Sequence, residues 1–285
     1  MHDTFNLAWK LNLVIRGLAH QSLLSTYEEE RRKIAQGLIA FDVQHCKAFS
    51  QGDEALARNF DENIRFIAGV GAEYSKGLLT KLDDESRTHQ GLRPGSLLLP
   101  AKVTRYIDAN PIDIQLDIPL LGQFRLYLIV PDVIAAKLFL DSFCASLHAP
   151  GSCLHRLSSM ANKSYQAVPR GFAPSDEYAS PQRYTAVSQL FTLALVTATP
   201  KANFEIRDLP PILQQSRWTV YLDDRTSPRC TEKLLGSLAH DDAVTVNVRP
   251  DGYVGSIGRW SGVQDVGVGE RAAKWVDEHY SSFMQ

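Results

Sequence analysis

The sequence predicts an α/β protein with two parts, a helical section over residues 1–90 and a mixed α/β domain over residues 91–285. Three observations support this division. The first part has helical periodicity, and a turn-rich connector, Gly91–Pro100, follows it with the sequence GLRPGSLLLP. Beyond the connector, β-prone runs alternate with helical segments, and the chain closes with a hairpin and a helix.

The first helix is expected over Thr4–Gly17, TFNLAWKLNLVIRG, where apolar residues lie nearly all round. A helix with that pattern is typical of a protein interior rather than a surface. It begins only a few residues after Met1, so nothing in the sequence precedes it to form the surrounding walls. We therefore expect it to be buried against a neighbouring domain that this sequence does not contain.

A second helix is expected to begin at Ser25 or Thr26, because Ser25 and Glu28 have the spacing of a capping box. It continues through Glu–Arg and Glu–Lys pairs four residues apart, in the orientation that stabilises a helix. A third helical stretch is expected over Asp53–Lys81. The buried face of the second helix is predicted to consist of Ile34, Leu38, Phe41, Cys46 and Phe49.

Strand signals dominate the C-terminal part. Asp251 and Gly252 form a strong turn dipeptide between the last two strands, and Arg249 just before it is expected to be an exposed strand end. Strands that alternate with helices and finish in a hairpin plus a helix predict a thioredoxin-like α/β layout. The expected strands are Gly122–Val130, Leu190–Thr199, Trp218–Leu222, Val244–Val248 and Tyr253–Ile257, and the expected helices are Asp132–Leu147 and Gly269–Tyr280.

Composition and charge exclude several classes of function. Hydrophobic residues make up 44% and charged residues 22%, which is typical of a globular protein with a packed core. With 30 Lys and Arg against 32 Asp and Glu, the net charge is -2, so no nucleic-acid partner is expected. Leu11–Leu18 is the longest apolar stretch near the start. Asn12 and Arg16 interrupt it, so no membrane span is expected.

The cysteines are expected to be thiols in a reducing, cytoplasmic compartment, since the N-terminus lacks the basic segment and cleavage site of a secretory signal. No Cys-x-x-Cys pair is present to support dithiol exchange. Cys144 and Cys153 are close enough in sequence to meet, but buried apolar thiols are the expected outcome. The four cysteines are Cys46, Cys144, Cys153 and Cys230.

A group of potential metal ligands lies in the string CASLHAPGSCLH, but its spacing fits none of the usual zinc patterns. We expect a helix end followed by a loop with surface histidines, and we expect His45 on the second helix to face solvent. No Gly-x-Ser-x-Gly elbow is present for a hydrolase. We therefore assign no catalytic residue and no metal ligand. The group consists of Cys144, His148, Cys153 and His155.

Four strings occur in a suggestive order: MHDTFNLAWKLNLVIRG, STYEEERRKIAQGLI, RPGSLLLPAKVTRYIDANPIDIQLDIPLLGQFRLYLIV and VNVRPDGYVGSIG. Together they resemble the C-terminal part of the phenol 2-monooxygenase family of class A FAD-dependent aromatic hydroxylases. The first two resemble the helices that follow the family's second flavin-binding motif. The last two resemble the start and the closing hairpin of its thioredoxin-like C-terminal domain, whose Arg-Pro-Asp-Gly core is its most recognisable string.

The resemblance implies an enzyme that uses FAD, NAD(P)H and dioxygen to hydroxylate a small phenolic substrate. No Gly-x-Gly-x-x-Gly turn follows a strand here, and the family's flavin motifs and phenol pocket would lie upstream of Met1. No catalytic residue is therefore carried over. Only Met1–Thr4 would approach a flavin, so Met1 and Asp3 are the candidate cofactor-binding residues. They would lie at the flavin edge, and only if the missing fold is supplied.

Three functional hypotheses follow. The first is a piece of an aromatic hydroxylase of catabolism or secondary metabolism, as a truncated gene product, a pseudo-enzyme or half of a split enzyme, unable to hydroxylate alone. The second is a non-catalytic thioredoxin-like dimerisation or interaction module, which would pair with itself as a homo-oligomer or with a full-length hydroxylase. The third is a cofactor-free enzyme on the same scaffold, which no residue constellation supports.

Overall fold

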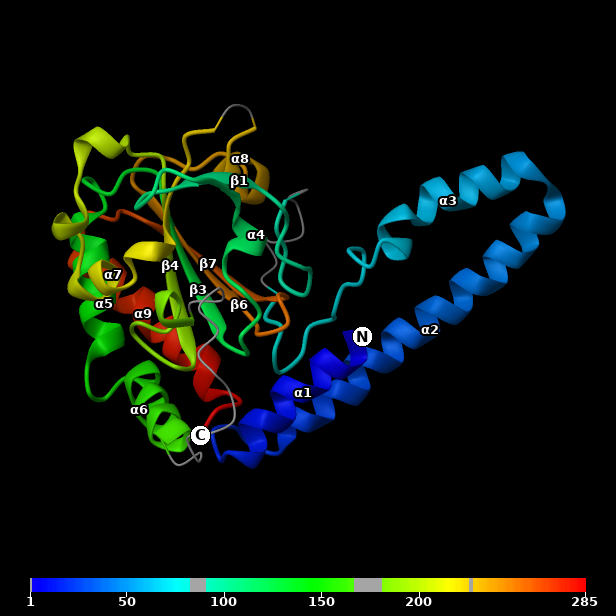
Figure 1. Cartoon of the computed structure of the whole chain (residues 1–285), viewed down its shortest axis with the longest axis horizontal. Helices are drawn as coiled ribbons and strands as arrows, with labels where there is room; N and C mark the ends of the chain where they lie inside the picture. Colours follow the sequence, from blue (N-terminus) through cyan, green and yellow to red (C-terminus); the bar gives the residue numbers. More distant parts are fainter. Residues whose placement is uncertain (1, 83–90, 167–180, 226–227) are drawn as a thin grey trace.

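The computed structural model describes residues 2–82, 91–166, 181–225 and 228–285. Figure 1 shows an α/β body and a helical section in which α1 lies along α2, while α2 and α3 extend away from the body as a long hairpin. The bounds of these helices are His2–Ile15 for α1, Ser22–Gln51 for α2 and Asp53–Ile67 for α3.

Helix α1 is buried on one side only. Trp9 and Leu13 are buried, and the Trp9 ring meets the Phe124 ring of the body edge-on at 5.7 Å. On the opposite side, Leu11 is 36% exposed and Ile15 is 79% exposed. Within this chain the helix is therefore buried on one side, and its burial against a further domain stays a prediction. The walls that do exist come from α2 and the α/β body.

Helix α2 begins at Ser22 rather than at Ser25. The Ser25 hydroxyl donates to the Ser22 carbonyl at 2.7 Å, so it does not cap the helix and the predicted capping box with Glu28 is not formed. Glu28 pairs instead with Arg32, as their four-residue spacing predicts.

The α2–α3 hairpin is packed internally but leaves an outward apolar face. Phe41 of α2 meets Phe66 of α3 with the ring centroids 5.9 Å apart. The prediction that Cys46 and Phe49 complete a buried face is wrong, because Cys46 is exposed and Phe49 is 72% exposed. The outward apolar face consists of Leu38, Ile39, Val43, Phe49, Ile64 and Ile67.

Helix α3 ends at Ile67 rather than continuing to Lys81. Gly69 has a φ of +74°, a left-handed conformation that ends helices because only glycine adopts it without steric cost. The chain then returns to the body, where the Tyr74 amide donates to the Gly95 carbonyl at 2.9 Å.

The described residues form a seven-stranded mixed sheet in the order β2-β1-β5-β4-β3-β6-β7. Strands β3, β4 and β5 are parallel, whereas β6 pairs antiparallel with both β3 and β7. The strands are β1 Lys102–Arg105, β2 Pro111–Asp113, β3 Phe124–Val130, β4 Phe191–Thr197, β5 Val220–Leu222, β6 Asp242–Val248 and β7 Val254–Ser261.

Helices cover both faces of this sheet (Figure 1). Helices α5, α6 and α9 lie on the face that also receives α1, while α4 and α8 lie on the other face. The helices are α4 Ile114–Asp117, α5 Lys137–His148, α6 Cys153–Gln166, α7 Pro211–Gln215, α8 Cys230–Leu235 and α9 Val266–Ser281. Short 3-10 turns occur at Pro181–Arg183, Lys201–Asn203, Ile206–Asp208 and Arg217–Thr219.

The thioredoxin-like prediction is confirmed by the neighbourhood β4-β3-β6-β7, with α5 and α6 between β3 and β4 and with α9 after the hairpin. The hairpin turn is also confirmed. Gly252 has a φ of +84°, and its amide donates to the Arg249 carbonyl at 2.9 Å. Within the described part of the chain, no helix is both long and apolar enough to cross a bilayer. The division between residues 1–90 and 91–285 stays a prediction.

Candidate functional site

The densest polar constellation lies where α1 and α2 meet the turn between β6 and β7. It consists of Lys10 from α1, Glu30 from α2, and Arg249 and Asp251 from the turn. We call these four residues the junction cluster. The Lys10 side chain is 0% exposed, the Arg249 side chain 2% and the Asp251 side chain 4%. Charges buried so deeply are stable only when they are paired.

Arg249 is clamped between the two carboxylates. Its Nη1 and Nη2 atoms donate to the two oxygens of Glu30 at 2.5 and 3.0 Å. Its Nε and Nη2 atoms donate to the two oxygens of Asp251 at 3.0 and 2.6 Å. Lys10 donates to Glu30 Oε2 at 2.9 Å. Two bidentate contacts fix the guanidinium in both position and orientation.

Neighbouring side chains complete the hydrogen bonding and exclude water. Asn6 lies one turn before Lys10 on α1 and donates to Glu30 at 2.9 Å and to Asp251 at 3.2 Å. The Trp9 indole donates to Asp251 at 3.2 Å. The guanidinium of Arg249 lies over the rings of Trp9, Tyr74 and Tyr253, 5.0–5.6 Å from their centroids.

The electrostatics match this pairing. Burial lowers the pKa of Lys10 to about 8, and the neighbouring Glu30 only partly offsets that effect. Burial would raise the pKa of Glu30, but the charges of Arg249 and Lys10 outweigh it and lower that pKa. Burial would lower the pKa of Arg249, but Asp251 and Glu30 raise it overall. The cluster is a balanced structural clamp of two cations and two anions.

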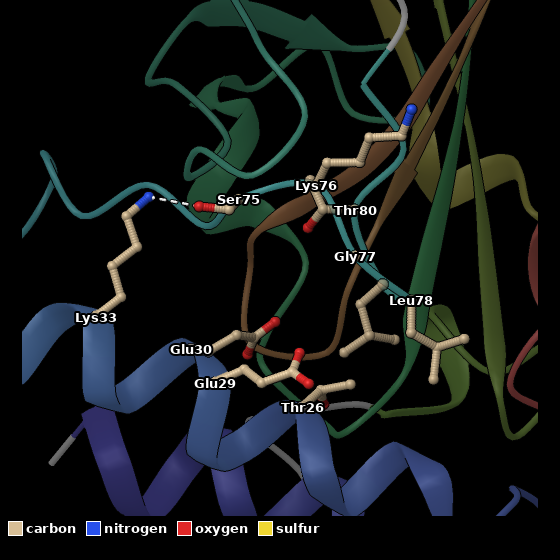
Figure 2. Close-up of a pocket in the computed structure, with 10 residues that line it drawn as sticks. Thr26, Glu29, Glu30, Lys33, Ser75, Lys76, Gly77, Leu78 and Thr80 are labelled. Carbon is tan, nitrogen blue, oxygen red and sulfur yellow. Dashed lines mark hydrogen bonds between the residues drawn. The ribbon is translucent and has the colours of Figure 1, made fainter.

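A small pocket lies beside the cluster, between α2 and the segment Ser75–Thr80 (Figure 2). Figure 2 shows Glu29 and Glu30 pointing from α2 into this gap, with Lys33 reaching across to Ser75 at 3.0 Å. The volume of about 60 Å³ holds water but no organic ligand. The pocket is therefore part of the contact between α2 and the body.

Asp3, the predicted cofactor-binding residue that the structure describes, lies on the first turn of α1. Its carboxylate accepts a hydrogen bond from Arg31 of α2, and its side chain is 59% exposed. Arg31 in turn donates to the Tyr74 hydroxyl at 3.3 Å. Met1, the other predicted residue, lies outside the described residues. The flavin-edge role of both stays a prediction.

The prediction that Arg249 is an exposed strand end is wrong, because its side chain is only 2% exposed. Its partner Glu30 is 219 positions away, and local sequence carries no sign of that pairing. Asp251 does form the turn, as predicted, and its carboxylate also accepts a hydrogen bond from the Arg249 guanidinium. The available signal was the Arg-Pro-Asp-Gly string itself. A turn requires only its Asp-Gly part, so the arginine in this string pointed to a further role.

His45 is also not where the sequence placed it. Its ring is half-buried between α2 and α3, with Nδ1 3.0 Å from the Asn59 amide oxygen and the ring edge-on to Phe60. The prediction of a solvent-facing histidine is wrong because α3 folds back along α2 and covers it.

The cysteine and histidine group divides between α5 and α6. Cys144 and Cys153 are buried free thiols, as predicted, and burial raises the pKa of both. The segment after the Pro-Gly break is a helix rather than a loop, with His155 on α6 next to His148 at the end of α5. Among the described residues, no three potential ligands converge into a metal site.

The described sheet does not fit a dinucleotide. A pyrophosphate normally rests on a helix N-terminus that is reached through a glycine turn after a parallel strand. Here β3 is followed by Pro131–Ala136 and β4 by Ala198–Asn203, and neither segment contains glycine. Among the described residues, neither of these two segments therefore offers the glycine turn on which a pyrophosphate usually rests.

Two known families match this chain, one on each side of the junction cluster. Residues 72–283 match the phenol hydroxylase C-terminal dimerisation domain. The chain belongs to this family. Residues 1–42 match part of the FAD binding domain family. The junction cluster therefore joins two family segments, with Lys10 and Glu30 from the FAD-binding match and Arg249 and Asp251 from the dimerisation domain.

Relatives of this phenol hydroxylase-type chain are aromatic monooxygenases. The 3-hydroxybenzoate 4-monooxygenase of Comamonas testosteroni is 29% identical, over all of this chain and 43% of the relative. Phenol 2-monooxygenase fsqG of Aspergillus fumigatus is 26% identical, over 90% of this chain and 41% of the relative. The chain thus spans about two fifths of the length of these relatives.

A solved structure supports the fold. The complex of aklavinone-11 hydroxylase with FAD and aklavinone superposes with a TM-score of 0.50 at 16% identity, covering 98% of this chain and 38% of that one. The likeness extends over the helical section and the α/β body together. At this identity it supports the arrangement of the elements and carries no functional residue across.

A buried histidine near the junction gives a pH prediction. His279 of α9 is 2% exposed, and its Nδ1 has no hydrogen-bond partner among the described residues. Burial, with Lys81 and Arg249 nearby, lowers its pKa to about 3. Between pH 6.5 and 3 the unfolded chain binds a proton that the folded chain does not, so stability falls as pH falls through that window.

We expect the stability difference between the unaltered chain and His279→Gln to change by about 2 kcal/mol from pH 6.5 to pH 5, in favour of the variant. Urea unfolding at both pH values measures this difference. The same substitution at the exposed His20 is the control for losing a histidine that the fold does not bury. Parallel pH profiles for the unaltered chain and His279→Gln would show that His279 is not held neutral.

Proposed function

We propose that this chain is the C-terminal part of an FAD-dependent aromatic monooxygenase and that it does not hydroxylate on its own. The junction cluster carries the proposal, because it fastens the helices of the FAD-binding match onto the dimerisation domain through buried charges. Such a contact is expected where the two domains of one enzyme are held in fixed register.

The proposed reaction is hydroxylation of a small phenolic ring with FAD, NAD(P)H and dioxygen. The names of the relatives, 3-hydroxybenzoate 4-monooxygenase and phenol 2-monooxygenase, support this substrate class. FAD, when bound, would supply the oxygen chemistry. The part proposed for this chain is to place Met1 and Asp3 at the flavin edge and to pair two subunits.

The outward apolar face of the α2–α3 hairpin supports a missing neighbour. Single exposed apolar side chains are normal, but several of them on one projecting element are typical of a protein contact. Leu38 and Val43 on α2, and Ile64 on α3, are half exposed or more. A flavin-binding fold, from a longer chain or from a hydroxylase partner, is the proposed cover.

The second candidate is a non-catalytic dimerisation module. It is favoured by the match over residues 72–283, whose family description is a dimerisation domain, and by the absence of a glycine cradle from the described sheet. This module would act by pairing with itself or with a full-length hydroxylase. For either candidate we propose a cytoplasmic location, as the sequence predicts.

The intact mass of the polypeptide from its native source decides between the two candidates. A mass well above 31.8 kDa, together with bound FAD, is expected for the hydroxylase. A mass of 31.8 kDa would contradict a longer chain and favour the module or a split enzyme.

Light scattering of the purified chain is expected to give twice the chain mass, and a monomer would count against the module.

FAD titration tests the expectation that the chain is incomplete. We expect no saturable quenching of flavin fluorescence by residues 1–285 alone and no NAD(P)H oxidation with added FAD. Saturable binding at micromolar protein would contradict this expectation and would place a flavin site on the helical section. Assay of the native, full-mass polypeptide in parallel provides the positive control.

A further inference from the structure

A second cavity lies far from the junction, at the start of α5. It has a volume of about 340 Å³ and is open to solvent at one side. We propose that this cavity binds a neutral aromatic molecule of one or two rings that carries a hydroxyl or carbonyl group. The lining residues are Val133, Ile134, Lys137, Leu140, Asn203, Phe204, Asp208, Leu209 and Pro210.

The position of the cavity follows from the sheet topology. Strands β3 and β4 are parallel neighbours, so the segments that follow them leave the sheet at the same edge. Val133 and Ile134 come from the segment after β3, while Phe204 and Leu209 come from the segment after β4. The two segments therefore meet at one edge of the sheet and leave a concave apolar space between them, the kind of site in which small molecules bind.

The size of the cavity sets the size of the ligand. A cavity of roughly 150 Å³ accepts benzene, so about 340 Å³ accommodates a substituted ring or two fused rings. The volume is far too large for a single water molecule. It also lies near the lower limit of small-molecule pockets, which excludes a dinucleotide.

The floor of the cavity is apolar and contains an aromatic ring. Val133, Leu140, Phe204 and Leu209 are each no more than 6% exposed, so they form fixed walls rather than mobile surface groups. The Phe204 ring packs against the Tyr106 ring with centroids 5.1 Å apart, which holds it in place. A planar ligand therefore meets one aromatic and several aliphatic surfaces.

Both loops that form the cavity are fixed by hydrogen bonds. The Val133 amide donates to the Thr199 hydroxyl at 2.9 Å, which ties the segment after β3 to the segment after β4. The Tyr106 hydroxyl donates to the Phe204 carbonyl at 2.9 Å. The Leu209 carbonyl accepts from a Gln214 amide at 2.8 Å. A preformed cavity binds without the cost of ordering its walls.

The rim carries one cation and one anion, and each is paired within the protein. Lys137 is paired with Asp141 at 2.7 Å, and Asp208 accepts the Glu205 amide at 2.8 Å in a capping box. Both rim charges thus have partners within the protein. Asn203 lies exposed at the mouth, where its amide offers one donor group and one acceptor to a hydroxyl or carbonyl.

This inference goes beyond the proposed monooxygenase. Every lining residue belongs to the dimerisation-domain match, and none comes from the segment that matches the FAD binding domain. The cavity would therefore bind its ligand whether or not a flavin is present. Binding here and hydroxylation elsewhere are separable in experiment.

The test is titration of the full chain, without FAD, with 2-naphthol as the neutral two-ring probe and 2-naphthoate as its anionic counterpart, followed by protein NMR. We expect saturable binding of 2-naphthol with a Kd on the order of 1 mM or tighter, and binding of the anion about tenfold weaker. The shifted resonances should include those of Val133 and Leu209. Absence of saturation, or equal affinity for the two probes, would overturn the proposal.

Matched variants test the location. Ile134→Trp is expected to obstruct the mouth and to weaken 2-naphthol binding about tenfold or more, and its 58% exposure makes folding unproblematic. Leu138→Trp, 48% exposed in the first turn of α5 and outside the lining, is the control and should bind normally. Unchanged binding by Ile134→Trp overturns the site. Loss of dimers in Ile134→Trp alone, by light scattering, would reassign the cavity to a subunit contact.

Discussion

Replacing Arg249 by methionine is expected to lower the free energy of unfolding by about 3–5 kcal/mol, because it leaves two carboxylates buried without their main partner. Glu30 and Asp251 each make two hydrogen bonds to this guanidinium. Lys10 remains beside Glu30, but it makes a single contact and its pKa is already lowered by burial. Urea unfolding at pH 7 measures the effect.

The matched control is Arg32→Met, the same substitution on the exposed face of α2. Arg32 pairs with Glu28, and both side chains are more than half exposed. Exposed ion pairs contribute at most about 1 kcal/mol, so the control should lose much less stability. Equal losses for the two variants would mean that the junction cluster does not hold the helical section against the body.

Amide hydrogen exchange shows which elements lose protection in the Arg249→Met variant. Because Arg249 is the link between the turn and α2, its loss should raise exchange in α1 and α2. Strands β3 and β4 lie in the centre of the sheet and should stay protected in Arg249→Met. Uniformly raised exchange would point to global destabilisation instead of release of the helices.

The central strands were predictable because each is buried on both faces. All seven residues of β3 and all seven of β4 are buried, and apart from Arg125 in β3 and two threonines in β4 both strands read as apolar runs of strand length. The turn at Asp251 and Gly252 was also predictable, since the dipeptide itself favours it. The residues of each segment alone were therefore sufficient to predict these two strands and this turn.

The sequence did not predict features that depend on distant partners or on short segments. The apolar stripe of α2 predicted burial, yet burial depends on a neighbour that the described residues do not supply. Strands β1 and β2 are short and lie at the sheet edge, and Pro111 in β2 further weakens the strand signal. Helix α6 follows the Pro-Gly break and has a polar outer face, so its segment resembled a loop.

The candidate site shows the same limit. Asn6, Lys10 and Glu30 lie in strings that resemble the family, but nothing in those strings indicates a pairing, and only folding brings the three residues to the turn at Arg249. The resemblance to aromatic hydroxylases located the two segments that the cluster joins, but not the residues that join them. A buried ion pair between distant segments has no local signature.

Adding a methyl group at Gly269 is expected to cost about 1–3 kcal/mol, through overpacking where α9 crosses α5. A Cβ atom there would overlap Ser142 Oγ and would lie 2.5 Å from the Phe139 carbonyl oxygen and 2.9 Å from the Phe143 amide nitrogen. Ser142 can rotate away, but the other two atoms belong to the α5 backbone. One of the two helices must therefore move.

Gly267→Ala, two residues earlier in the first turn of the same helix, is the matched control. A Cβ atom there would lie 3.2 Å from Arg271 Nη1, the mobile end of a long side chain, so the neighbour yields at little cost. Alanine also has a higher helix propensity than glycine, by about 1 kcal/mol in a helix interior, so this variant should be neutral or slightly more stable.

The sign of the difference between these two variants is the decisive result. Helix propensity favours alanine over glycine at both positions, so a loss of stability at Gly269 alone points to the close approach of α9 to α5. Thermal or urea unfolding measures both. Equal behaviour would mean that the two helices are farther apart than the structure shows.

Because α5 also carries Leu140 of the apolar cavity, Gly269→Ala is further expected to weaken 2-naphthol binding, whereas Gly267→Ala is not.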